Sequence, residues 1–181
     1  MRFPTFVLAA FGAAALLLGG CSTAPETGPD RTQLHNDAQA SLNDFKTQDP
    51  SLDNVLHNAY GFAIFPSIGK GAVGVGGAYG QGEVYQQGNR VGYADMTQAT
   101  VGASIGGETY AELIVFQNAD ALQRFQSGQL TFAADASAVA AKAGAAADAN
   151  WQNGVTIFVS VKGGLMTEAS VGGQKFNYQP L

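Results

Sequence analysis

The sequence predicts an α+β domain whose sheet is largely antiparallel and strongly curved or barrel-like, with two N-terminal helices and one short internal helix. Three observations favour this fold class. Short apolar segments of strand length recur along the chain, and glycine pairs stand between several of them. Apolar residues between positions 34 and 59 recur instead at helical spacing. Seven of the 24 glycines lie between residues 66 and 85, where dense glycine indicates sheet curvature or a close backbone approach.

Length and composition indicate one folded domain. The chain has 181 residues, of which 46% are hydrophobic and 13% charged, so a single core is expected rather than a disordered chain. It contains one cysteine, which excludes both a disulfide framework and a cysteine-rich zinc site.

The N-terminus has the three parts of a secretory signal: Arg2, an apolar run over 6–18, and the small residues Gly19 and Gly20. Leu18 to Cys21 resembles the bacterial lipobox, in which the cysteine is acylated, as with palmitate, and becomes the mature N-terminus. We therefore expect a lipoprotein signal peptide over 1–20, lipidation at Cys21, a flexible tether over 21–31 and one domain over 32–181. Ser22 is not the aspartate that resembles an inner-membrane retention signal, which favours the outer membrane of a bacterial cell envelope.

Two helices are expected before the sheet. The first starts at Thr32, places Leu34, Ala38, Leu42 and Phe45 on one face, and ends before Pro50. The second starts at Ser51 as its N-cap, buries apolar residues over 52–59 and is closed by Gly61. The acidic polar face of the first helix favours packing on the sheet over lying on lipid.

Strands follow. Phe62 to Phe65 form a buried strand stopped by Pro66, because proline removes a ladder donor. A hairpin over 81–92 turns at Gly88-Asn89, and a second hairpin within 91–116 turns at Gly106-Gly107.

The rest of the chain mixes one helix with further strands. A short helix spans 118–127, with Asn118 as N-cap. The first half of 130–148 favours a strand, and its second half stays open. Three strands at 155–161, 165–171 and 175–178 form a β-meander with glycine turns.

The usual chemical motifs are absent from the sequence. The P-loop pattern fails because Gly71 follows Lys70, and the dinucleotide pattern fails because Tyr79 replaces its third glycine. The two histidines, His35 and His57, have no metal-binding spacing, and no GxSxG occurs. Removing Arg2 with the signal takes the net charge from −5 to −6, which disfavours nucleic acid as a partner. We expect no enzyme activity, no metal and no cofactor.

Several blocks, in order, resemble the SYLF domain. The first is Tyr60 to Pro66 followed by Gly69-Lys70-Gly71 and glycines up to Gly82. Later blocks lie at 101–107, 113–125, 132–137 and 164–171, so the resemblance covers about residues 34–181. It implies a lipid-binding module, and eukaryotic members bind phosphoinositides through basic residues. After Ser137 the chain departs from the eukaryotic pattern, which puts actin and phosphoinositide binding in doubt.

Two functions follow as hypotheses. In the first, the protein is a non-catalytic, membrane-anchored lipoprotein that binds anionic phospholipid or phosphoinositide-type head groups through Lys70, Arg90 and Lys175. In the second, it is a structural or protein-interaction lipoprotein of the envelope, whose only lipid contact is its acyl anchor. The protein partner in that case is unknown.

Overall fold

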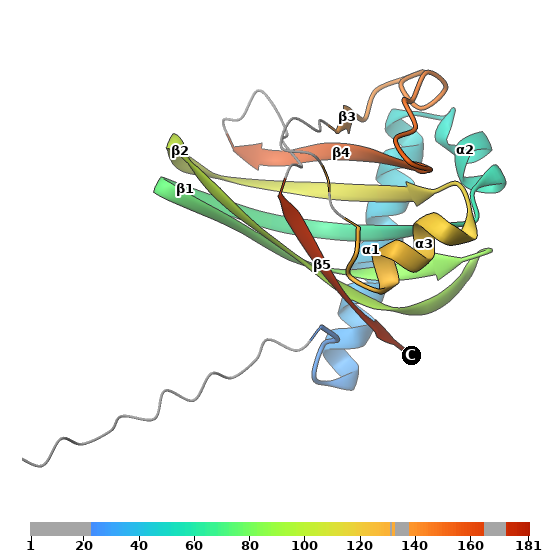
Figure 1. The fold of residues 1–181 in the computed structure, drawn as a ribbon, viewed down its shortest axis with the longest axis horizontal. Coiled ribbons are helices and arrows are strands. Elements are labelled where there is room, and N and C mark those ends of the chain that lie inside the picture. The colour runs from blue at the N-terminus through green and yellow to red at the C-terminus, as the bar shows by residue number, and fades with distance from the viewer. Residues whose placement is uncertain (1–22, 131, 133–137, 165–172) are drawn as a thin grey trace, which may run out of the picture.

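The computed structural model describes residues 23–130, 132, 138–164 and 173–181 of the chain. Within these residues, three helices and five strands follow one another (Figure 1). In order they are α1 (Gly28–Gln48), α2 (Leu52–Asn58), β1 (Gly61–Gln86), β2 (Asn89–Phe116), α3 (Ala119–Gln126), β3 (Val139–Ala140), β4 (Val155–Gly164) and β5 (Gln174–Pro180). None of the helices in these described ranges is long and apolar enough to cross a membrane.

β1 and β2 form one antiparallel hairpin whose register runs from Gly61 opposite Phe116 to Gln86 opposite Asn89. Gln87 and Gly88 make its two-residue turn with φ angles of 48° and 80°, a combination typical of a type I′ turn. The turn therefore lies one residue before the predicted Gly88-Asn89, because a type I′ turn favours glycine at its second central position, which Gly88 occupies.

Two predicted interruptions of the strands were wrong. Pro66 does not stop the first strand, because it lies at a register shift between Phe65 and Ile68, where the ladder is already irregular. Gly106 and Gly107 do not turn either, since they pair with Ala72 and Gly71 within the same ladder. The predicted second hairpin is instead the continuation of β2.

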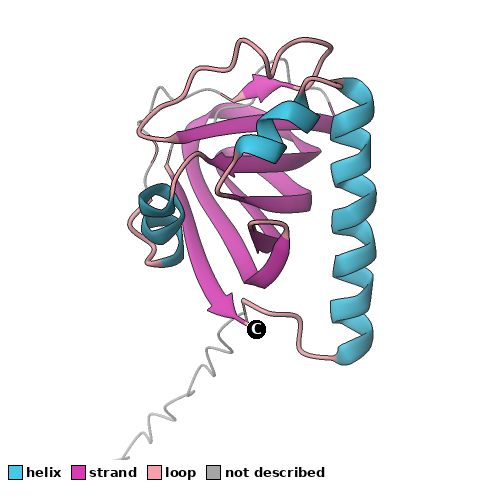
Figure 2. Cartoon of the chain, turned by 90° about the vertical axis from the view of Figure 1, so that its right-hand side faces the viewer, coloured by secondary structure: helices cyan, strands magenta, loops and turns pink. Residues whose placement is uncertain are grey.

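The long hairpin folds back on itself, and glycines lie where its two halves meet. A Cβ atom on Gly82 would be 2.5 Å from the Ile64 carbonyl oxygen, and one on Gly80 would be 2.9 Å from that of Ser67. At Gly61 the corresponding distance to the Tyr85 carbonyl oxygen is 2.5 Å. The prediction that dense glycine marks a close approach of backbone is confirmed at Gly80 and Gly82 but not at Gly69 and Gly71, where a Cβ would meet nothing within 4 Å. Figure 2 shows the strong curvature of the hairpin.

The remaining strands extend the sheet from β2. Its order is β1-β2-β4-β3, with β5 pairing separately on β2. All the pairings are antiparallel except that of β3 with β4. β4 and β5 therefore both pair with β2. The middle strand of the predicted meander, 165–171, lies outside the described residues. Strand pairings within the described residues do not close the sheet, so a barrel is not confirmed.

Side chains alternate between two apolar cores. The inner core lies between the halves of the folded hairpin and includes Phe65, Met96, Phe116 and Phe176, with α3 packed against it. The outer core lies beneath α1 and α2 and includes Phe45, Leu113 and Phe158 from the described residues. The described side chains of the hairpin thus fall on an inner or an outer side.

The helices agree with the sequence apart from one boundary. α1 begins at Gly28, four residues before the predicted start, because the Thr27 side chain accepts a hydrogen bond from the Asp30 amide and proline occupies the first turn. Residues 28–31 of the predicted tether are therefore helical. α2 follows Ser51, and Asn118 caps α3 by accepting from the Ala121 amide at 2.9 Å.

Candidate functional site

The first described residues bind to the outer side of the sheet at Asp95. The Thr23 hydroxyl donates to Asp95 Oδ2 at 2.7 Å, and Asn177 of β5 donates to Oδ1 at 2.7 Å. Gln81 Nε2 also donates to the Thr23 carbonyl oxygen, at 3.4 Å. Ala24 is buried. The carboxylate of Asp95, on β2, thus joins Thr23 to β5.

We call this outer surface of β2 and β5, with Gln81 and Thr23, the Asp95 face. Lys175 belongs to the Asp95 face, because it lies two residues before Asn177 on β5 and points to the same side of the sheet. Its strand partner is Thr97. Tyr79, which pairs with Thr97 from β1, is 41% exposed. The Asp95 face therefore combines an exposed lysine with an exposed aromatic ring.

Arg90 lies on the same outer side but is engaged by a buried carboxylate. Its guanidinium contacts Glu83 Oε1 at 2.5 Å, and Glu83 is fully buried. The hydrogen bond that Arg90 donates to Glu83 raises the pKa of Arg90. Arg90 and Arg31 lie 5.6 and 5.7 Å from the centre of the Tyr93 ring. Arg90 thus serves first to neutralise a buried acid.

α1 contributes to the same network. His35 Nδ1 lies 3.0 Å from Glu83 Oε2, which also accepts a hydrogen bond of 2.6 Å from the Tyr85 hydroxyl. Gln39 donates to that hydroxyl at 2.8 Å. Burial, together with the bond to Glu83, raises the pKa of Tyr85. These contacts bind the middle of α1 to the hairpin, close to the turn.

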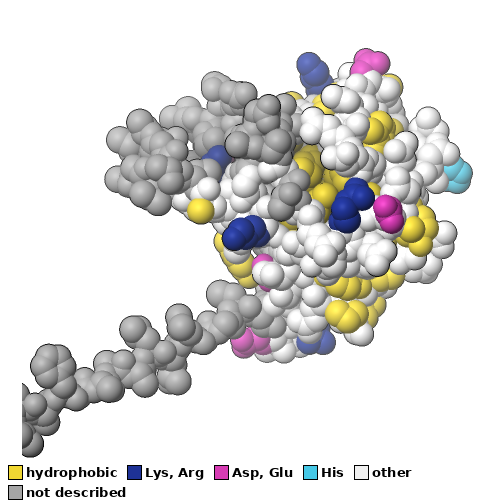
Figure 3. All heavy atoms as spheres, viewed as in Figure 1, with side chains coloured by type: hydrophobic (Ala, Val, Ile, Leu, Met, Phe, Trp, Pro, Cys, Tyr) yellow, Lys and Arg dark blue, Asp and Glu magenta, His cyan; other side chains and the backbone are white. Residues whose placement is uncertain are grey.

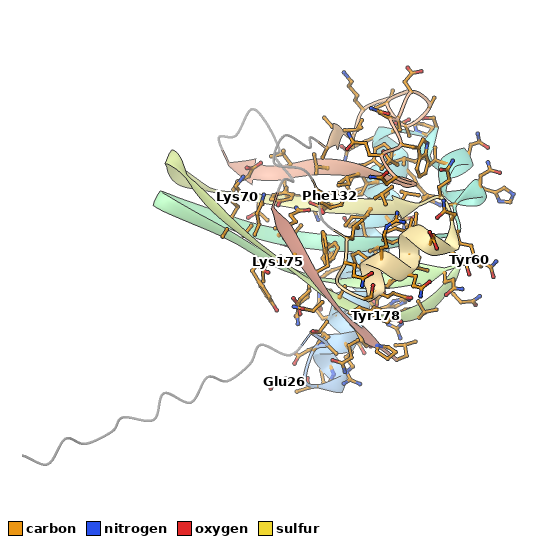
Figure 4. The ribbon with its side chains drawn as sticks, in the orientation of Figure 1. Glu26, Tyr60, Lys70, Phe132, Lys175 and Tyr178 are labelled. Carbon is orange, nitrogen blue, oxygen red and sulfur yellow. The ribbon has the colours of Figure 1, made fainter. Side chains whose placement is uncertain are left out.

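Lys70 is in a different place. Lys70 lies two residues after the buried Ile68 on β1, so both side chains point to the inner side. Its strand partner on β2 is Glu108. Figure 4 shows Lys70 on β1 and Lys175 on β5, in separate layers of the folded sheet. Neither lysine forms an ion pair with another described residue. The structure therefore places Arg90 and Lys175 on one side and Lys70 on the other.

The inner side also holds a buried acid. Glu112 is fully buried, and its Oε2 accepts a 2.8 Å hydrogen bond from Gln174 Nε2. Glu112 Oε1 and Gln174 Oε1 have no hydrogen-bond partner within the described residues. Burial raises the pKa of Glu112 to about 7. A protonated Glu112 could donate to Gln174 Oε1, which would satisfy both atoms at once.

Metal-binding geometry is not found in the part of the chain that the structure describes, where no three histidine, cysteine or acidic side chains gather. His35 is committed to Glu83, and His57 lies in the last turn of α2. The roles of Thr23 and Asp95 were not predicted from the sequence. The only signal in the sequence is that Asp95 is an acidic residue within a predicted strand region.

Comparison with known proteins gives two matches. Residues 97–179 match the family model Ysc84, described as "Las17-binding protein actin regulator". The chain is also 26% identical over 154 residues to Beta cell expansion factor A of Aeromonas veronii. That alignment covers 84% of this chain and 59% of the relative, so the chain spans about three-fifths of the relative's length. The family match agrees with the SYLF resemblance found in the sequence motifs.

Proposed function

We propose that the chain, whose residues 97–179 match the Ysc84 (SYLF) family model, is a non-catalytic lipid-binding module held on a bacterial envelope membrane by an acylated Cys21. Its ligands on that membrane are anionic phospholipid head groups. Ser22 after the acylated residue directs the protein to the outer membrane. The family description concerns actin regulation, and we do not extend it to this chain, which departs from the eukaryotic pattern after Ser137.

The observation that carries the proposal is the attachment of Thr23 to Asp95. Cys21 precedes Thr23 by two residues, so its Cα atom lies within about 7 Å of that of Thr23 by covalent geometry alone. An acyl chain on Cys21 would therefore enter the membrane beside the Asp95 face. Lys175 lies on this face, about 7 Å along β5 from Asn177, which shares Asp95 with Thr23.

The anchor and the lysine contribute differently to membrane binding. An acyl chain contributes about 0.8 kcal/mol per buried CH₂ group, whereas one lysine near an anionic surface contributes about 1 kcal/mol. Attachment thus depends on Cys21, and Lys175 gives a preference for anionic lipid. Lys70 would make a second contact from the inner layer. Arg90 is the weakest candidate, because it would have to leave Glu83.

Acylation is tested by mass spectrometry of the protein from bacterial membranes. We expect acyl chains on Cys21 and release of the Cys21→Ser variant from the membrane fraction. An unmodified Cys21, or equal membrane retention of both proteins, would contradict the anchor.

Head-group binding is tested separately by vesicle flotation of a chain that begins at Ser22. At low salt we expect flotation with vesicles rich in phosphatidylglycerol but not with phosphatidylcholine alone. Lys175→Glu should reduce flotation, while the matched Lys142→Glu, an exposed lysine in the 141–149 loop, should not. Equal behaviour of the two variants would refute the lipid contact and favour the envelope-interaction alternative.

A further inference from the structure

One row of the Asp95 face carries exposed side chains from three neighbouring strands, and we call it the Tyr79 row. Tyr79 of β1 pairs with Thr97 of β2, and Thr97 pairs on its other edge with Lys175 of β5. All three residues are exposed, Tyr79 to 41%. The Cα atoms of Tyr79 and Lys175 are about 10 Å apart, which is twice the distance between neighbouring strands. Figure 3 shows a dark-blue side chain next to yellow ones in the region where Figure 4 labels Lys175.

The surface beside the Tyr79 row is open. The next row on the same side of the sheet pairs Gly77 with Ala99, and both residues are exposed. Neither carries more than a methyl group. Of the described atoms, a Cβ atom on Gly77 would meet only the Gln98 carbonyl oxygen within 4 Å, at 3.5 Å. A flat ligand can therefore reach the Tyr79 ring across these two small residues.

The accessible charge on this part of the face is a single ammonium group. Its strand residues, 77–81, 95–99 and 173–177, include two charged side chains, Asp95 and Lys175. Asp95 is buried, and its two oxygens accept hydrogen bonds from Thr23 and Asn177. Lys175 forms no ion pair with any residue in the described ranges. One ammonium group matches a carboxylate better than a phosphate monoester, which carries about two negative charges.

Recognition here must come from side chains. β2 is paired on both edges along this row, with β1 and with β5, so no peptide strand can add to it. The groups that remain are the Tyr79 ring, the Thr97 hydroxyl, the Asn177 amide and the Lys175 ammonium group. A pyranose ring has C–H groups on its faces that pack on an aromatic ring, and its hydroxyl groups exchange hydrogen bonds with hydroxyl and amide side chains.

We propose that the Tyr79 row binds a carboxylated oligosaccharide, such as a chain of uronic acid units. One pyranose ring packs on Tyr79 beside Gly77, and the carboxylate of a neighbouring unit pairs with Lys175. Thr97 forms hydrogen bonds with the hydroxyl groups between these two points. The ligand needs at least two linked rings, because one ring does not reach from Tyr79 to Lys175. The site shares Lys175 with the proposed lipid contact but does not depend on the acyl anchor.

Calorimetry with trigalacturonate measures this binding, with the full chain held in detergent micelles that contain no phospholipid. We expect saturable binding, about 10-fold tighter than that of maltotriose, which has as many rings but no carboxylate. Tricarballylate, which has three carboxylates and no ring, should also bind about 10-fold more weakly than trigalacturonate.

Five variants test the geometry. Tyr79→Ser should weaken trigalacturonate binding about 10-fold, whereas Tyr79→Phe keeps the ring and should bind like the parent protein. Lys175→Gln should lower the affinity for trigalacturonate to that for maltotriose. Ala99→Leu should weaken both sugars about 10-fold, because its side chain fills the open row beside Tyr79. Lys142→Gln, at an exposed lysine in the 141–149 loop, is the matched control and should bind like the parent. Every replaced side chain is exposed, so the thermal unfolding midpoints should stay close to that of the parent.

The absence of saturable trigalacturonate binding would overturn this site. Tricarballylate binding as tight as that of trigalacturonate would also overturn it, because attraction by charge alone would then be enough. So would unchanged affinity in Tyr79→Ser or in Lys175→Gln. Flotation with phosphatidylglycerol vesicles tests the proposed function separately. Absent flotation with intact trigalacturonate binding would refute only the lipid contact, and the reverse result would refute only the oligosaccharide site.

Discussion

Replacing Glu112 with glutamine should remove a pH-dependent loss of stability. The Glu112 carboxyl is fully buried and its pKa is raised by desolvation from 4.5 to about 7, opposed only by the Gln174 hydrogen bond. Between these two values the unfolded chain releases the Glu112 proton while the folded chain retains it. The free energy of unfolding therefore falls as pH rises through this window and levels off above the folded pKa.

The expected magnitude follows from the two pKa values. Each pKa unit corresponds to about 1.4 kcal/mol, so the cost at pH 8 relative to pH 4 is about 3 kcal/mol. Glu112→Gln has no proton to lose, and its amide can pair reciprocally with that of Gln174. The stability difference between variant and parent should thus shift by about 3 kcal/mol in favour of the variant from pH 4 to pH 8.

Urea unfolding of both proteins, followed by Trp151 fluorescence at unit steps from pH 4 to pH 8, measures this difference. Other titrating groups affect parent and variant alike and cancel. Glu26→Gln is the matched control, because Glu26 is exposed (labelled in Figure 4) and its replacement should leave the difference constant with pH. If the Glu112→Gln difference changed by less than about 1 kcal/mol across this range, Glu112 would not be held protonated by burial.

Three further substitutions test the fold. Gly82→Ala should destabilise by about 3 kcal/mol or more, because its Cβ would lie 2.5 Å from the Ile64 carbonyl oxygen, whereas Gly69→Ala, with nothing within 4 Å, should be neutral in the same urea assay. Equal effects would show that the halves of the hairpin do not touch at Gly82. Asp49→Ala should cost about 3 kcal/mol, since the carboxylate accepts bonds from the Gly144 and Ala146 amides at 3.0 and 2.6 Å; a loss under about 1 kcal/mol in thermal unfolding would contradict those bonds. Asn118→Ala should cost about 1 kcal/mol by removing the α3 cap, and Asn118→Asp should restore it, so a variant as stable as the parent would exclude the cap.

The helices were predictable because their signals are local. Apolar spacing and the residues Ser51 and Asn118 are enough to locate α2 and α3 to within a residue or two. Only Asn118 caps its helix as predicted, because the Ser51 hydroxyl donates to Asp49 instead. Only the start of α1 differed, because Pro29 and Thr27 read as tether residues in isolation but also fit the first turn of a helix.

The long hairpin was not predictable in the same way. Glycine pairs indicate turns when each strand is considered alone, and Pro66 indicates an end. Whether Gly106-Gly107 turns depends on what stands opposite, and that partner, Gly71 and Ala72, is more than 30 positions away. The glycine and proline signals therefore predicted close backbone packing, but they also led to the prediction of several short strands where β1 and β2 are two long ones.

The basic residues show the same limit with functional consequences. The sequence favoured Lys70 among Lys70, Arg90 and Lys175, because it follows the motif that resembles the SYLF signature. What separates the three in the fold is register: Arg90 faces a buried Glu83, Lys70 lies on the inner side, and Lys175 lies on the Asp95 face. A carboxylate that joins Thr23 to β5 could not be recognised before the pairing of Asp95 with Asn177 was known. That contact ties the place where an anchor on Cys21 would enter the membrane to one side of the domain. Lys175 is therefore the basic residue whose replacement best separates membrane contact by the folded domain from attachment by the acyl chain alone.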